Sequence, residues 1–180
     1  SIESPASPIL TNIIINNNRA ESGDGGGIYI ENGSSAVFSA ISIIDNYAGD
    51  GGGGIYIENG SNPIITNSII AHNEANTDGG GIVCFREANP TFANVTIADN
   101  IGVRGGGIFI SLDSNPVFQN SIIFYNNDSE VYFSDTFNSD TSSITLDFIN
   151  LGGSIEGIVF NDYNQINYFP ANLNQPPLFT

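Results

Sequence analysis

The chain has 180 residues and carries 19 acidic residues against three basic ones, all arginine, which gives a formal net charge of −16. That charge excludes nucleic acid as a partner, because a phosphate backbone needs lysine and arginine side chains to replace its counterions. The 40% hydrophobic content suffices for one ordered domain, a single cysteine excludes an internal disulfide framework, and the lack of a long apolar run argues against membrane insertion.

Five apolar stretches follow one another along the chain, each opened by proline or alanine and closed by asparagine ten residues later. Between them, Gly-Gly-Gly-Ile recurs at spacings of 27, 27 and 26 residues, starting at Gly25. Within each repeat, hydrophobic residues alternate over runs of four to six that stop at Gly, Asn or Pro, as in Gly54 to Glu58. This pattern predicts about three short strands per repeat and no helix.

Short strands repeated at one fixed period can pair only with their copies in the next repeat. We therefore predict an all-β fold, a right-handed parallel β-helix: a solenoid of about five similar coils of about 27 residues, with three parallel sheets. Residues 1–127 form the regular coils. Residues 128–180 are expected to form irregular final coils and a C-terminal cap of the same domain, with strands around 131–133 and 143–149.

Stacked coils place equivalent residues in columns along the axis. The predicted inward columns are Ile28, Ile55, Ile82 and Ile108; Ile30, Ile57, Cys84 and Ile110; Leu10, Phe38, Ile65, Phe92 and Phe118; and Ile15, Ile43, Ile70, Ile97 and Ile123. A corner column should form a structural ladder, because asparagine caps turns and its amide can bond the next amide in the stack. Its members are Asn18, Asn46, Asn73, Asn100 and Asn126.

Gly-Gly-Gly-Ile together with Ile-x-x-Asn is similar to the repeats of secreted right-handed parallel β-helix proteins of the pectate-lyase-like fold. It also resembles the Gly-Gly-Ala-Ile and Phe-x-x-Asn repeats of chlamydial polymorphic outer-membrane proteins. The segment from Ser121 to Thr180 resembles the closing part of large exported β-helix repeat proteins. These resemblances imply a secreted or cell-surface location, and activities in such families range from adhesion to polysaccharide cleavage.

The first candidate site is an outward aromatic column on the strand after the glycines, which could bind a neutral glycan or a surface protein. Aromatic rings on neighbouring coils would be spaced by about 4.8 Å, which suits stacking on sugar rings. The same spacing also suits ordinary cross-strand packing. The candidate residues are Tyr29, Tyr56 and Phe109, flanked by Glu31, Glu58 and Phe85. We expect this face to be exposed, because no long loop is visible in the sequence to wall it.

Two further candidates contain carboxylates. His72 is predicted between Asp45 and Asp99 on neighbouring coils, which could form a proton-transfer group or a weak metal site, or simply a surface ion pair. Asp24, Asp50 and Asp78 precede the glycines and could offer oxygens to calcium, although aspartate before glycine is also a common turn signal.

No catalytic residue is assigned, because neither the calcium-aspartate cluster with a basic residue of pectate-lyase-like enzymes nor the aspartate triad of polygalacturonase-like enzymes is recognisable. We therefore expect a non-enzymatic structural or adhesive role, as a stalk, adhesin segment or self-assembling fibre subunit, with no cofactor other than calcium. The alternative is a carbohydrate-active module that uses the aromatic column. Head-to-tail self-association through an open N-terminal coil is expected to be available to the chain.

Overall fold

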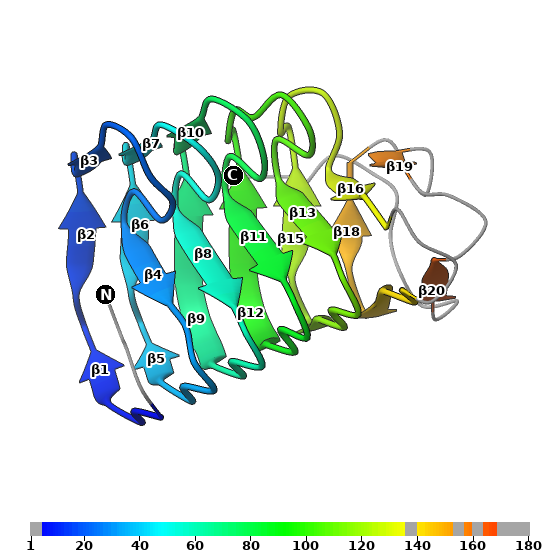
Figure 1. The fold of residues 1–180 in the computed structure, drawn as a ribbon, viewed down its shortest axis with the longest axis horizontal. Coiled ribbons are helices and arrows are strands. Elements are labelled where there is room, and N and C mark those ends of the chain that lie inside the picture. Colours follow the sequence, from blue (N-terminus) through cyan, green and yellow to red (C-terminus); the bar gives the residue numbers. More distant parts are fainter. Residues whose placement is uncertain (1–4, 136–139, 153–156, 160–163, 169–180) are drawn as a thin grey trace.

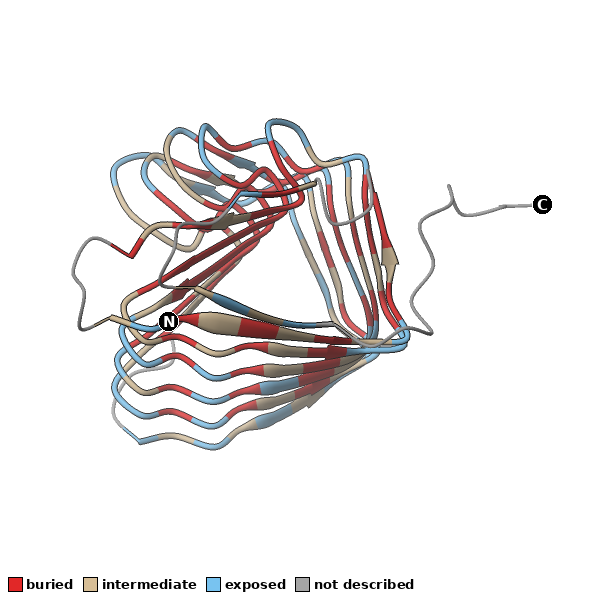
Figure 2. Ribbon diagram, turned by 90° about the vertical axis from the view of Figure 1, so that its right-hand side faces the viewer, coloured by how far each residue is buried: buried red, intermediate tan, exposed pale blue. Residues whose placement is uncertain are grey.

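The computed structural model describes residues 5–135, 140–152, 157–159 and 164–168. Short strands recur coil after coil along the longest axis of the molecule (Figure 1). Viewed along that axis, three sides enclose a triangular interior lined by buried residues (Figure 2). Within the described residues, no helix is long and apolar enough to cross a membrane.

Sheet A has six strands, and the triple glycines lead into its first four. Every neighbouring pair in it is parallel, with each hydrophobic residue beside its equivalent in the next coil. The strands are β4 (Ile28–Ile30), β8 (Ile55–Glu58), β11 (Ile82–Phe85), β13 (Ile108–Ser111), β16 (Val131–Phe133) and β19 (Ile158–Val159).

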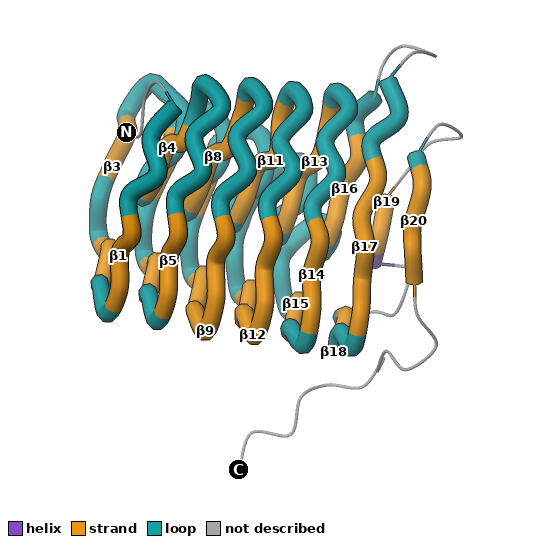
Figure 3. The backbone as a smooth tube through the Cα atoms, turned by 90° about the horizontal axis from the view of Figure 1, so that it is seen from below, coloured by secondary structure: helices purple, strands orange, loops and turns teal. Residues whose placement is uncertain are grey.

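Sheet B has eleven strands and forms two adjacent sides of the triangle, which meet at one corner. Figure 3 shows this part of the molecule from below. Two of its strands run through that corner without a break. The strands are β1 (Ile9–Thr11), β2 (Ile14–Asn16), β5 (Val37–Ser39), β6 (Ser42–Ile44), β9 (Ile64–Ala71), β12 (Thr91–Ala98), β14 (Val117–Gln119), β15 (Ile122–Phe124), β17 (Ser143–Asp147), β18 (Asn150–Leu151) and β20 (Gln165–Tyr168).

Sheet C is a small three-stranded sheet that follows the closing asparagines and leads into the loops before sheet A. Its strands are β3 (Arg19–Ala20), β7 (Tyr47–Ala48) and β10 (Glu74–Ala75). All pairs in the three sheets are parallel, which confirms the prediction of an all-β parallel β-helix with three parallel sheets and coils of about 27 residues.

The core contains the four predicted inward columns, together with further buried residues such as Ile41 and Val95. Their members in the second to fourth coils are buried, whereas Leu10 and Ile15 in the first described coil are half-buried. Phe92 and Phe118 stack on neighbouring coils with ring centroids 4.5 Å apart. Cys84 fills an isoleucine position, and burial raises the pKa of its thiol. The interior is therefore a continuous apolar stack, as predicted.

The closing asparagines form the predicted ladder. The side-chain amide of Asn46 donates to Oδ1 of Asn73 at 3.0 Å, and Asn73 donates to Oδ1 of Asn100 at the same distance. Each amide also donates to a backbone carbonyl, as Asn73 does to Ile43 at 3.0 Å. At the far end, Asn126 donates to Oε2 of Glu130 at 2.6 Å, so a buried carboxylate replaces the next asparagine.

The triple glycines serve two different purposes. In the second coil Gly52 has a positive φ of 67°, which favours glycine, whereas Gly53 and Gly54 do not. A Cβ on Gly54 would lie 2.6 Å from the carbonyl oxygen of Gly81 and 3.0 Å from Cγ2 of Ile70. The first glycine is thus required by its backbone conformation, and the third by the close approach of the neighbouring coil.

The described C-terminal strands continue the cylinder, since β16 pairs with β13 and β17 pairs with β14 in the same parallel register. The strands expected around 131–133 and 143–149 are therefore present. Residues 136–139, 153–156, 160–163 and 169–180 of the predicted final coils and cap lie outside the described residues.

Candidate binding groove

The loops between sheet C and sheet A fold back across the outer face of sheet A and create a groove there. A Cβ on Gly51 would lie 3.3 Å from Cε2 of Tyr56 and 3.3 Å from Cγ2 of Val83, so the loop backbone passes directly over these side chains. The groove has a volume of about 480 Å³. The expectation that no loop walls this face was wrong, because the short glycine-rich loops lie along the sheet instead of projecting away from it.

The floor of the groove is formed by Tyr56, Phe85 and Phe109 of the predicted aromatic site, whereas Tyr29 lies outside the groove lining, and the column is only partly exposed. Tyr29 and Tyr56 are half-buried and stack with centroids 5.4 Å apart, while Phe85 is tilted by 55° to Tyr56 at 6.4 Å. Phe109 is 4% exposed and Val83 1%. The prediction of an exposed column therefore needs correction at Phe109, which is covered by Arg104 from the loop of its own coil and by the stacked ring of Tyr132.

One wall of the groove carries the loop carboxylates. Asp24, Asp50 and Asp78 all line it, so two separately predicted candidates, the aromatic column and the aspartate series, meet in one site. They do not form one column, however. The amides of Gly25, Gly52 and Gly79 donate to the carbonyls of Gly51, Asp78 and Arg104, each of which precedes the equivalent glycine of the next coil. Those bonds define a column that contains Asp24, Gly51, Asp78 and Arg104.

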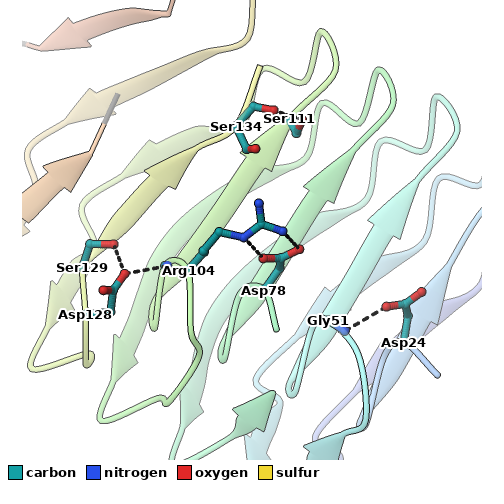
Figure 4. A network of polar contacts seen from close by, with 9 residues as sticks. Asp24, Gly51, Asp78, Arg104, Ser111, Asp128, Ser129 and Ser134 are labelled. Carbon is teal, nitrogen blue, oxygen red and sulfur yellow. Dashed lines mark hydrogen bonds and ion pairs between the residues drawn. The ribbon is translucent and has the colours of Figure 1, made fainter. Parts of the chain in front are cut away.

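Arg104 lies inside the groove and is held by Asp78 of the preceding coil (Figure 4). Its Nε donates to Oδ1 of Asp78 at 2.7 Å and its Nη2 to Oδ2 at 2.9 Å, a bidentate ion pair. The guanidinium carbon lies 5.2 Å from the ring centroid of Phe109. Burial raises the pKa of Asp78, and the hydrogen bonds from Arg104 act against that rise.

The far end of the groove is lined by Ser111, Leu112 and Ser134, and Ser111 donates its hydroxyl to the Ser134 carbonyl at 2.6 Å. The site therefore combines apolar ring surface, carboxylates, one guanidinium and hydroxyls. Such a combination of an apolar floor with a few polar groups is typical of a ligand-binding site.

A family model for the right-handed β-helix region matches residues 11–169. This chain belongs to the right-handed β-helix family. The match covers most of the described coils and agrees with the predicted fold. Comparison with curated proteins and with solved structures finds no match.

Glu58 of this β-helix lies beside the groove and is 7% exposed. It accepts a hydrogen bond from the hydroxyl of Tyr29 and pairs with Arg86, whose Nη1 lies 3.3 Å from its Oε2. Burial and the neighbouring Glu58 raise the pKa of Tyr29. Glu58 therefore positions Tyr29, the ring that stacks on Tyr56 of the groove floor. Glu31, the equivalent residue in the first coil, is half-buried.

The column around His72 is a corner of the coil, and all its members have a left-handed backbone. Their φ values are 54° at Asn17, 55° at Asp45, 54° at His72, 55° at Asp99 and 60° at Tyr125. Asparagine, aspartate and histidine tolerate this conformation best among residues with a side chain. Within the described part of the chain, no hydrogen bond or ion pair joins His72 to either aspartate. The backbone thus accounts for the residue types in this column.

The described residues contain no group of three or more His, Cys, Asp and Glu side chains arranged to hold a metal ion. Asp24 accepts the backbone amide of Gly51 at 2.9 Å, and Asp78 is engaged by Arg104. Asp24 and Asp78 therefore have protein partners in this structure, and calcium binding by the series stays a prediction.

Arg104 and Ser134 were not among the predicted site residues. A signal for Arg104 was present in the sequence: counting back from the first glycine of each motif places Arg104 in the same column as Asp24 and Asp78. Grouping the aspartates by chemistry instead selected Asp50, which lies one residue earlier in its loop than Asp24 and Asp78.

Proposed function

We propose that this β-helix is an extracellular or cell-surface protein with a non-enzymatic structural and adhesive role, and that it binds its partner through the groove over sheet A. The groove is the observation that carries the proposal, because it presents partly exposed aromatic rings and polar side chains side by side. Coils in strict parallel register give a rigid support for such a surface. The lysine-free composition with many Asn, Gly and Ser residues supports a location outside the cell.

A neutral glycan is the first class of ligand whose chemistry fits this role. The edges and faces of Tyr56 and Phe85 offer apolar surface to sugar C–H groups, and the carboxylates of Asp24 and Asp50 can accept hydrogen bonds from hydroxyls. A polyanionic glycan would be repelled by a protein of net charge −16. A surface protein is the other class of partner with a suitable chemistry.

A glycan array probed with the wild-type chain and with Phe85→Ala tests this role. We expect specific binding to neutral glycans, weakened at least about tenfold in the variant, which is the effect typical of a central aromatic contact. Ile64→Ala is the matched control, because Ile64 is an exposed apolar residue on sheet B, away from the groove. Binding that survives Phe85→Ala unchanged, or release of glycan fragments by the wild type, would contradict the proposal.

Carbohydrate cleavage is the second candidate function, because the Asp24 and Asp50 carboxyls line the groove beside its aromatic rings. Burial raises the pKa of Asp24, and a carboxyl with a raised pKa is what a general acid requires. Reducing ends released from a neutral glycan panel by the wild type, and lost in Asp24→Asn, would establish cleavage in place of simple binding.

The fibre form of the structural role would use the first described coil. Among the described strands, β1 and β2 pair on one side only, with β5 and β6. A recess of about 200 Å³ opens beside them, lined by Leu10, Ile13, Ile15 and Phe38 among others. Head-to-tail stacking would cover this recess. Electron microscopy with and without calcium should show filaments, whereas isolated short rods under both conditions would limit the role to adhesion.

A further inference from the structure

Each arginine of this chain lies over an aromatic ring and beside a carboxylate. The guanidinium carbon is 3.7 Å from the ring centroid of Tyr47 for Arg19, 4.7 Å from that of Phe85 for Arg86, and 5.2 Å from that of Phe109 for Arg104. The paired carboxylates are Glu21, Glu58 and Asp78. A cation between an aromatic face and a carboxylate is thus a recurrent arrangement in this fold.

The arrangement around Arg104 has an equivalent two coils earlier in the groove. In sheet A, Tyr56 pairs with Val83, and Val83 pairs with Phe109, so Tyr56 is the counterpart of Phe109. In the loop column, Asp24 is the counterpart of Asp78, and Gly51 is the counterpart of Arg104. The second coil therefore has the ring and the preceding coil has the carboxylate, but a glycine stands where the fourth coil has its guanidinium. One neighbour differs, because Phe109 has Val83 beside it in the preceding coil, whereas Tyr56 has Tyr29, which stacks on one of its faces.

The groove is open at this second position. Asp24, Gly51 and Tyr56 line it together, and Tyr56 is half-buried where Phe109 is covered. Oδ1 of Asp24 accepts the Gly51 amide at 2.9 Å, and among the described residues no arginine pairs with this carboxylate. Burial raises the pKa of Asp24, and the nearby carboxylates of Asp50, Glu58 and Asp78 raise it further. A bound cation would relieve that repulsion.

We propose that the groove binds an arginine side chain of a partner protein, with its guanidinium against Asp24 and beside the part of Tyr56 that faces the groove, close to the position that corresponds to Arg104 two coils further on. The inference rests on the proposed function of the groove as a binding surface, and it selects a surface protein as the partner. A planar guanidinium is preferred to an ammonium, because it can lie on a ring and bond a carboxylate in the same plane.

The test is a nuclear magnetic resonance titration of the full chain with N-acetyl-arginine amide. We expect the backbone amides of Gly51 and Tyr56 to shift, with no such shifts for N-acetyl-citrulline amide, which has the same shape without the charge. Asp24→Asn should weaken binding at least about tenfold, while its side-chain oxygen can still accept the Gly51 amide. Asp99→Asn removes the same charge at a corner outside the groove and should leave binding unchanged.

Gly51→Arg provides a second, independent test, since it should supply the missing guanidinium from within the chain. A Cβ at this position is 3.2 Å from the Asp78 carbonyl oxygen, so its neighbours must move by a few tenths of an ångström. The variant should be folded by circular dichroism and should no longer bind the arginine probe. Probe binding that persists in folded Gly51→Arg would overturn the proposal.

The remaining outcomes separate the arginine site from the wider role of the groove. Equal shifts with arginine and citrulline probes, or equal binding of N-acetyl-lysine amide, would overturn the guanidinium site. If no arginine shift occurs but glycan binding depends on Phe85, the site is wrong and the proposed function stands. If neither probe binds, both proposals fail.

Discussion

Asn73 connects three coils through one buried side chain. Its Oδ1 accepts the backbone amide of Asn46 at 3.1 Å and the side-chain amide of Asn46 at 3.0 Å, and its own amide donates to Ile43 and Asn100. Asn73→Ala would leave these buried partners without hydrogen bonds, at about 1–3 kcal/mol for each unsatisfied group. We expect the free energy of unfolding to fall by about 3 kcal/mol or more in urea denaturation.

Asn94→Ala is the control for that prediction. Asn94 lies at an exposed corner with a φ of 55°, and Ala40 occupies the equivalent corner with a φ of 54°. Alanine is thus compatible with this conformation, and Asn94→Ala should lower the free energy of unfolding by about 1 kcal/mol or less. An Asn73→Ala variant no less stable than Asn94→Ala would contradict the structural role of the ladder.

At the scale of elements, the glycine loops determine how closely coils can stack. Gly54→Ala would place a Cβ 2.6 Å from the Gly81 carbonyl oxygen, a backbone atom that can move only if the whole coil shifts. Overpacking of this kind costs about 1–3 kcal/mol, and we expect the midpoint of urea denaturation to fall accordingly. Gly23→Ala, where a Cβ would meet nothing within 4 Å, should change stability by less than about 0.5 kcal/mol. Equal effects of the two substitutions would refute this account of the loops.

The strands and core could be predicted from the sequence, whereas the groove could not. A column such as Phe38, Ile65 and Phe92 follows from the period alone, because strands in register repeat every side chain at one height. The loop path depends on contacts between backbones of different coils, such as the Gly52 amide with the Asp78 carbonyl at 2.9 Å. Hydrophobic pattern carries no signal for such contacts, which is why the cover over Phe109 was missed.

On the scale of the whole molecule, the negative charge should make stability depend on pH. Burial raises the pKa of Asp24, Asp78 and Glu130 above their unfolded values, so the folded state holds these protons more tightly. Their contribution to stability is complete below the unfolded pKa values and is lost as pH rises through the folded ones. Repulsion within a chain of net charge −16 acts in the same direction.

Urea denaturation at pH 5 and pH 7.5 measures that dependence. We expect a higher midpoint at pH 5, and at pH 7.5 a midpoint that rises when sodium chloride is added, because salt screens the exposed carboxylates. Asp24→Asn should reduce the difference between the two pH values. A lower midpoint at pH 5 would mean that carboxylates with lowered pKa values dominate the titration.

Hydroxyl-radical footprinting of the aromatic residues tests the central claim, a groove over sheet A with an accessible end and a covered end. Tyr125, which is 62% exposed, and the fully buried Phe92 are internal references for high and low reactivity. The structure predicts intermediate labelling of Tyr56 and Phe85, and labelling of Phe109 as low as that of Phe92. If Phe109 reacts as strongly as Tyr56, the loops do not cover this face and the groove does not exist as described.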